Sequence, residues 1–159
     1  MAMSMADFRA LREARKFVLE GRQHEIVENY DAADLSYQSA LAKFPAMIEA
    51  RFYLAMIHWI RASKASDLDT VEQLLSESID NAARASSPPE IECGNLAKVK
   101  KLLLLCQLGK EAEACTALTN AGFGYRLSKS ILHYDDFGSE PKSVEECVNS
   151  PDPYIKVWE

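Results

Sequence analysis

Apolar residues recur every three or four positions through most of the first 122 residues, which is the spacing of amphipathic helices. The first of these stretches follows Ser4 and Asp7, whose separation is that of a capping box at a helix N-terminus. Phe8, Leu11 and Val18 then continue at helical spacing. We therefore predict that the chain opens with a long helix.

Two further helices are predicted on either side of Pro45. Residues 29–43 carry apolar positions at helical spacing, and Pro45 ends this helix because proline cannot continue the hydrogen-bond ladder. The next helix, predicted over 47–62, is apolar almost all round, so other parts of the chain must cover several of its sides. Its apolar residues include Ile48, Phe52, Tyr53, Leu54, Met56, Ile57, Trp59 and Ile60.

Short polar or proline-containing breaks separate the later helices. A loop over 63–67 precedes a fourth helix, for which Asp69 is the predicted N-cap. The Ser-Ser-Pro-Pro sequence at 86–89 forms the clearest break in the chain. A fifth helix is then predicted over 90–108, and it contains four consecutive leucines before Gly109 breaks it.

A shorter sixth helix is predicted over 111–120, with Gly122 at its end. The order of helix, short turn and helix thus occurs three times in residues 1–122, and short connections of this kind favour antiparallel neighbours. We therefore predict an all-α fold of stacked antiparallel helical hairpins for 1–122.

Residues 123–159 differ in character, because glycine and proline interrupt them repeatedly. We expect an irregular C-terminal region here, with a short capping helix over 128–134 and an extended end over 154–158. That extended end has the sequence Tyr-Ile-Lys-Val-Trp. It needs a surface to pack against, either on this domain or on one that follows.

The hairpin over residues 17–45 resembles a tetratricopeptide repeat, a 34-residue helix–turn–helix unit. The matching residues are Phe17 and Gly21 in the first helix, Ala33, Tyr37 and Ala40 in the second, and Pro45 after it. Small residues let two helices approach closely, and aromatic rings fill the gaps beside them. Glu20 and His24 depart from the pattern, and the later units match it less closely. The resemblance spans about residues 14–122.

The resemblance implies a stacked superhelix whose first helices line a groove that accepts a peptide or helix from a partner. Carried over to this chain, the groove would be lined by Arg15, Val18, Arg22, Phe52, Met56, Trp59, Val99 and Leu103. Some members of this class clamp a C-terminal carboxylate with lysine and asparagine. Val18 and Arg22 stand in those places here, so that ligand is not predicted.

A second interpretation of the groove residues stays open. Phe52, Met56 and Trp59 at helical spacing are also the pattern of a core. The chain could in addition fill its own groove, with 131–134 and 154–158 folded over the leucine run as a solenoid cap.

No catalytic or metal-binding pattern stands out. His24, His58 and His133 lie on different predicted elements, and none has the spacing of a metal-binding helix. We interpret His58 as a core residue of the apolar helix. The four cysteines match no zinc-ligand or redox spacing and are interpreted as buried thiols in a reducing compartment. No cofactor and no metal are predicted.

The charge balance narrows the class of partner. The formal net charge is −6, whereas proteins that bind nucleic acid usually carry a basic excess, and no stretch is apolar for long enough to cross a bilayer. We therefore predict a cytoplasmic protein–protein interaction module or scaffold that binds another protein or peptide segment, with no nucleic-acid or membrane partner. The alternative is the non-catalytic N-terminal helical domain of a larger enzyme, such as an oxygenase, which the extended end over 154–158 suggests.

Overall fold

The computed structural model describes residues 4–110, 112 and 113, and the part of the chain that it describes contains helices but no strand. The all-α prediction is confirmed over this part. The elements are α1 (Met5–Ile26), α2 (Tyr30–Lys43), α3 (Ile48–Arg61), a 3-10 turn η1 (Ala65–Asp67), α4 (Leu68–Ala82) and α5 (Pro88–Gln107). The predicted sixth helix and the whole region 123–159 lie outside the described residues.

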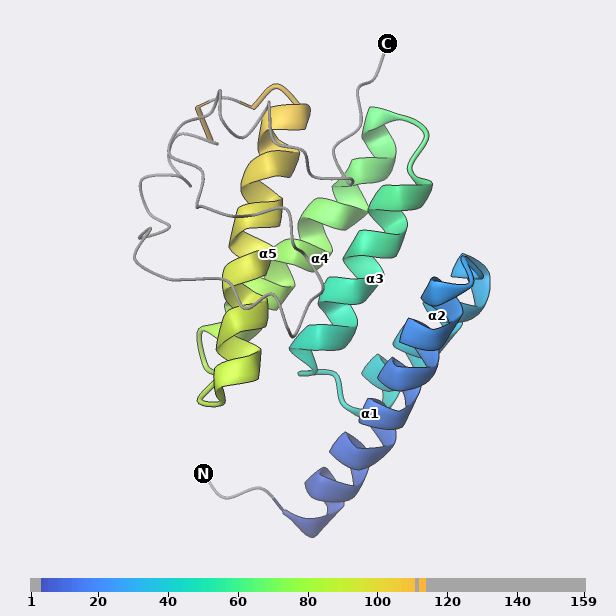
Figure 1. The fold of residues 1–159 in the computed structure, drawn as a ribbon. Coiled ribbons are helices and arrows are strands. Elements are labelled where there is room, and N and C mark those ends of the chain that lie inside the picture. Colours follow the sequence, from blue (N-terminus) through green and yellow to red (C-terminus); the bar gives the residue numbers. More distant parts are fainter. Residues whose placement is uncertain (1–3, 111, 114–159) are drawn as a thin grey trace.

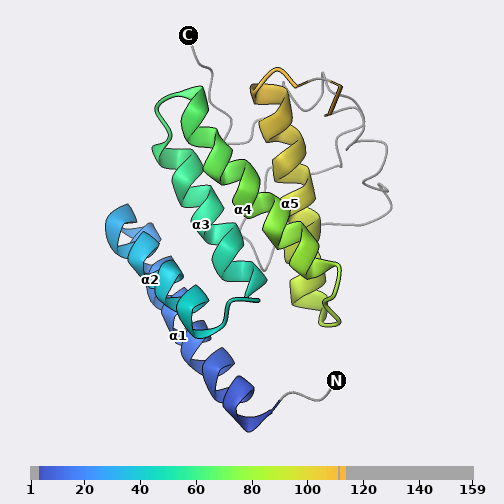
Figure 2. The same cartoon turned by 180° about the vertical axis from the view of Figure 1, so that it is seen from behind.

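Successive helices run antiparallel and pack as hairpins (Figures 1 and 2). α1 packs along α2, and α3 packs along α4. α3 lies between the first hairpin and α4, and α5 packs on α4 and less extensively on α3. The predicted hairpin packing is therefore present for the first two units and for the first helix of the third.

Capping residues fix the N-terminal ends of the first two helices. The Ser4 hydroxyl accepts from the Asp7 N–H at 3.1 Å, and the Asp7 carboxylate accepts from the Ser4 N–H at 3.3 Å, which completes the predicted capping box. Asn29 caps α2 by accepting from the Ala32 N–H at 3.3 Å. Each cap satisfies amide groups that have no partner within their own helix.

The turn between α1 and α2 is a Schellman motif with glutamate where glycine is usual. The Asn29 N–H donates to the His24 carbonyl and the Glu28 N–H donates to the Glu25 carbonyl, each at 2.9 Å. Glu28 has a φ of 58°, in the left-handed region that side chains with a Cβ disfavour.

We expect Glu28→Gly to raise the free energy of unfolding by about 1 kcal/mol, because glycine removes the left-handed strain at this turn. Urea unfolding followed by circular dichroism measures the change. Glu20→Gly, in the interior of α1, is the matched control and should lower the free energy by about 1 kcal/mol. If both variants lose stability, the turn does not require a positive φ at residue 28.

The first hairpin packs around Gly21 and Tyr37, two of the residues that carry the resemblance. Both are buried, together with Ala33 and Ala40 of α2. A Cβ at Gly21 would lie only 2.4 Å from Cε1 of Tyr37, so the tyrosine ring occupies the space that glycine leaves. The predicted pairing of a small residue with an aromatic ring is thus present.

The hydrophobic core is centred on α3. Phe52, Met56, Ile57 and Trp59 are fully buried, as expected for a helix with apolar residues on most of its sides. The Trp59 indole N–H donates to the Gln107 side-chain oxygen at 3.0 Å, which links α3 to the last turn of α5.

Two predictions about single residues are wrong. Asp69 does not cap α4, because the helix already begins at Leu68, and Asp67 instead accepts from the Ser63 and Lys64 N–H groups to hold the preceding turn. His58 is not a core residue. Its side chain is 36% exposed and its Nε2 lies 3.9 Å from the Asp34 carboxylate, because this edge of α3 faces the polar side of α2.

The two boundaries of α5 agree with the sequence pattern to within two residues. Pro88 and Pro89 occupy its first turn, where a missing N–H costs no hydrogen bond, so the helix starts slightly earlier than predicted. Gly109 ends it with a φ of 73°, and the Lys110 N–H donates to the Leu105 carbonyl at 2.9 Å.

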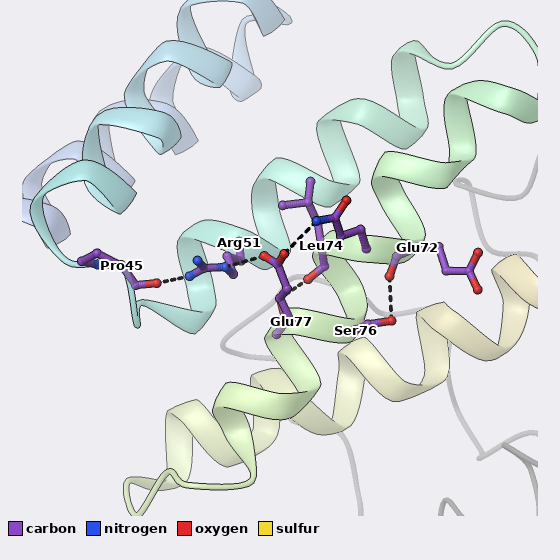
Figure 3. Close-up of polar contacts among 8 residues, drawn as sticks. Pro45, Arg51, Glu72, Leu74, Ser76 and Glu77 are labelled. Atoms are coloured by element: carbon purple, nitrogen blue, oxygen red, sulfur yellow. Dashed lines mark hydrogen bonds and ion pairs between the residues drawn. The ribbon is translucent and has the colours of Figure 1, made fainter.

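One arginine fixes the connection between the two hairpins. Arg51 of α3 donates through its guanidinium to the Pro45 carbonyl and, at 2.9 Å, to the Glu77 carboxylate of α4 (Figure 3). A charge-assisted contact of this kind holds the loop after α2 against both helices of the second hairpin. The neighbouring Ser76 hydroxyl, also drawn in Figure 3, donates to the Glu72 carbonyl within α4.

Candidate functional site

A cleft of about 290 Å³ opens where the first hairpin meets the ends of the other helices. We call it the junction cleft. Five segments contribute to it: α1, the loop before α3, the first turn of α3, the end of α4 with the following loop, and the start of α5. Its lining residues are Leu11, Arg15, Phe44, Ala46, Met47, Ile48, Glu49, Asn81, Arg84, Ala85, Ser86 and Glu90.

The unequal lengths of the first two helices help to create the cleft. α1 has 22 residues and α2 has 14, so the first turns of α1 continue past the end of α2. The ion pair between Lys43 and Glu13, at 3.2 Å, marks where α2 stops alongside α1. Leu11 lies on α1 beyond this point, where it packs against the edge of the core and lines the cleft.

Four charged side chains, two of each sign, line the cleft. Arg15 and Arg84 are exposed, and Glu49 and Glu90 are half-buried. Within the part of the chain that the structure describes, none of the four makes a side-chain hydrogen bond or an ion pair within 4 Å. Removing a charged group from water costs free energy, and a partner that hydrogen-bonds to the group offsets this cost.

Glu49 has the most perturbed environment of these four. Burial raises its pKa above the ordinary value of 4.5, nearby Arg15 acts in the opposite direction, and the like charge of Glu90 raises the pKa further. The free cleft therefore disfavours the ionised form of Glu49.

This perturbation predicts a pH dependence of stability. A carboxyl whose pKa is higher in the folded state binds more protons there than in the unfolded chain. Stability is therefore lost as the pH rises from about 4.5 through the raised folded pKa. We expect Glu49→Gln to abolish this loss, so that the variant gains stability relative to the natural chain as the pH rises above about 4.5.

Urea unfolding at a series of pH values measures the effect. Glu20→Gln is the matched control, because Glu20 is exposed on α1 and does not line the cleft. Parallel pH profiles for the natural chain and Glu49→Gln would contradict the assignment.

A cluster of charged and aromatic side chains lies beyond the cleft, along the contact between the first hairpin and α3. The Glu25 carboxylate accepts from Arg22 at 2.7 Å and from the Tyr37 hydroxyl. The Arg22 guanidinium lies 4.4 Å from the centre of the Tyr53 ring, and the Tyr37 and Tyr53 rings stack with centroids 5.7 Å apart. These contacts join α1, α2 and α3 at Tyr53.

The electrostatics of this cluster favour its present protonation states. Burial raises the pKa of Tyr37, and its hydrogen bond to Glu25 raises it further. Burial opposes the charge of Arg22, but Glu25, Tyr53 and Tyr37 together more than compensate, and the Arg22 pKa is raised overall. Burial also raises the pKa of Tyr53. The cluster is therefore a structural contact with fixed charges and not a source of protons near neutral pH.

The structure places most of the predicted groove residues in the interior. Phe52, Met56, Trp59, Val99 and Leu103 are at most 1% exposed, and Val18 is 5% exposed. Arg15 is exposed in the junction cleft, and Arg22 is half-buried over Tyr53. In this conformation the six buried residues offer no surface to a partner, which agrees with the interpretation of Phe52, Met56 and Trp59 as core. Coverage by 131–134 and 154–158 lies outside the described residues.

Only one of the four charged cleft residues, Arg15, was found by sequence reasoning. Glu49 could have been recognised as a carboxylate in the first turn of an otherwise apolar helix. Arg84 and Glu90 lie on either side of the 86–89 break and carry no motif, because only the packing of α4 and α5 brings them to the cleft. Cys93 is a buried thiol whose pKa burial raises, as predicted for the cysteines.

Over the described residues there is no group of histidine, cysteine, aspartate and glutamate side chains that could hold a metal ion. Among the helices built from the same residues, none is both long and apolar enough to span a bilayer.

The chain was also compared with known proteins. No protein-family model, no curated protein and no solved structure matches it. The tetratricopeptide resemblance therefore rests on the residues of the first hairpin and on their packing, and the family stays a prediction.

Proposed function

We propose that this chain is a protein-binding module whose junction cleft accepts a segment of another polypeptide. The observation that carries the proposal is that two arginines and two glutamates line the cleft and make no side-chain hydrogen bond or ion pair within 4 Å among the described residues. A peptide supplies backbone donors and acceptors and side chains of either charge, so it can satisfy all four groups. This class of ligand is also the one that the resemblance of residues 17–45 implies.

The size and walls of the cleft support a peptide over a large cofactor. Its volume of about 290 Å³ lies at the lower end of the range for sites that enclose a whole small molecule. Leu11, Phe44 and Ile48 supply apolar surface beside the charged groups. This combination suits one or two side chains of a longer segment that continues along the surface.

The test is a selection of short displayed peptides on the immobilised full chain. We expect the selected peptides to lose at least about tenfold in affinity for Ala46→Trp, which fills the cleft from an exposed loop position, and for Arg84→Glu, which reverses one cleft charge. Lys98→Glu is the matched control, because Lys98 is exposed on α5 outside the cleft.

Affinity is measured by fluorescence anisotropy after circular dichroism has shown that each variant is folded. The proposal fails if the selected peptides bind Ala46→Trp and Arg84→Glu as tightly as the natural chain. It also fails if no peptide is enriched over a surface without protein.

A further inference from the structure

A stripe of exposed apolar and basic side chains runs along α1. It consists of Phe8, Arg12, Arg15, Leu19 and Ile26, whose separations of four, three, four and seven residues keep them on one face of a helix. Phe8, Leu19 and Ile26 are 56%, 64% and 81% exposed. From Phe8 to Ile26 the stripe is about 27 Å long at the rise of an α-helix. Three large apolar side chains exposed along one helix face, with cations between them, suit a partner that is both apolar and charged.

The stripe lies on the exposed side of α1 and meets the junction cleft only at Arg15. The buried residues of this helix are Ala14, Val18 and Gly21, and Leu11 and Phe17 also pack against the core. The two arginines of the stripe are exposed, and neither has an ion pair or side-chain hydrogen bond within the described residues, although Arg15 is near enough to Glu49 to lower its pKa. Two exposed cations therefore lie between the apolar side chains.

A second copy of the chain does not suit this pattern. Parallel pairing places Arg12 opposite Arg12 of the other copy, and like charges in facing positions destabilise a helix pair. Antiparallel pairing about the middle of the stripe places Arg15 opposite Leu19 of the other copy, so the contact covers a cation without supplying an acidic group. Self-association would therefore either bring cations together or cover them without an acidic partner.

A membrane surface also fits the stripe less well than a protein does. Interfacial helices keep their cations on the polar face and their apolar residues together. Here Arg12 and Arg15 lie between Phe8 and Leu19, and the chain has a net charge of −6, which an anionic surface repels.

We infer that the α1 stripe docks an acidic amphipathic helix of a partner protein. On that helix, two acidic residues three positions apart face Arg12 and Arg15. One apolar residue lies four positions before the first acidic residue and another lies four positions after the second, and these two face Phe8 and Leu19. A helix laid on an apolar surface with anchors three and four residues apart is an established mode of recognition. The inference goes beyond the cleft proposal, because the two surfaces share only Arg15.

The test uses two synthetic helical peptides with leucine at the outer anchor positions, one with glutamate and one with lysine at the two inner positions. Binding to the full chain is measured by fluorescence anisotropy. We expect the glutamate peptide to bind at least about tenfold more tightly than the lysine peptide, with an affinity that falls as salt is added. Arg12→Glu should abolish this preference, because one glutamate and one arginine then face the two inner positions, and Leu19→Ser should weaken the binding of both peptides.

Leu35→Ser is the matched control, because Leu35 is 66% exposed but lies on α2 and should leave both affinities unchanged. Ala46→Trp should also leave them unchanged, which separates failure here from failure of the cleft proposal. Equal affinity for the two peptides, or no effect of Arg12→Glu, overturns the inference. Two other results also overturn the inference. Arg12-dependent binding to phosphatidylcholine vesicles containing phosphatidylserine would favour a membrane surface, and a dimer in sedimentation that Leu19→Ser abolishes would favour a second copy of the chain.

Discussion

Replacing Trp59 with alanine is expected to lower the free energy of unfolding by about 3–5 kcal/mol, because the largest side chain of the core is removed and a cavity remains. Trp59 is 0% exposed, and its indole joins α3 to α5 through Gln107. A loss of this size is a large fraction of the stability of a domain of this length. Urea unfolding followed by circular dichroism measures it.

The control for this experiment is Leu35→Ala, an exposed apolar position on α2 that should change stability by no more than about 0.5 kcal/mol. If Trp59→Ala costs less than about 1 kcal/mol, the side chain is not a core residue and its place in a binding groove regains support. The expected large loss means that weaker partner binding by Trp59→Ala cannot be taken as evidence for a groove.

Adding a single methyl group at Gly94 is expected to destabilise the chain by about 1–3 kcal/mol, even though alanine is the better helix former. A Cβ at Gly94 of α5 would lie 2.2 Å from the Cβ of Ala82, the last residue of α4. The two helices must therefore separate or shift to accommodate Gly94→Ala. Urea unfolding gives the change in free energy.

A double-mutant cycle identifies the cause. Ala82→Gly alone should cost up to about 1 kcal/mol through lost helix propensity, and Gly94→Ala combined with Ala82→Gly should recover most of the stability of the natural chain. If the double variant is no more stable than Gly94→Ala alone, close approach to Ala82 is not the reason that glycine is needed at this position.

Local sequence signals predicted the helices well, because each depends on residues close together in the chain. The spacing of Ser4 and Asp7, Pro45 after α2 and Gly109 after α5 each act through backbone groups within one turn. The error at Asp69 has the same origin. A local rule selects Asp69 by residue type alone, whereas α4 begins at Leu68 and the Asp67 carboxylate holds the preceding turn.

The candidate site was predicted much less completely, because it depends on how the hairpins pack. Periodicity identified Phe52, Met56 and Trp59 as one side of a helix, but it could not say whether that side faces a groove or the core. The junction cleft joins Arg15 to Glu90 across most of the described chain. The different lengths of α1 and α2 help to create the cleft, but they do so only when the second hairpin packs against the first.

The way in which the first hairpin is attached has a consequence for the motions of the molecule. α1 and α2 contact each other more extensively than either contacts α3, and α2 provides most of the contact with α3. A unit with more internal than external contacts can open as one cooperative segment in native-state hydrogen exchange. The loop held by Arg51 would be the pivot of that opening, and the width of the junction cleft would follow the angle of the hairpin.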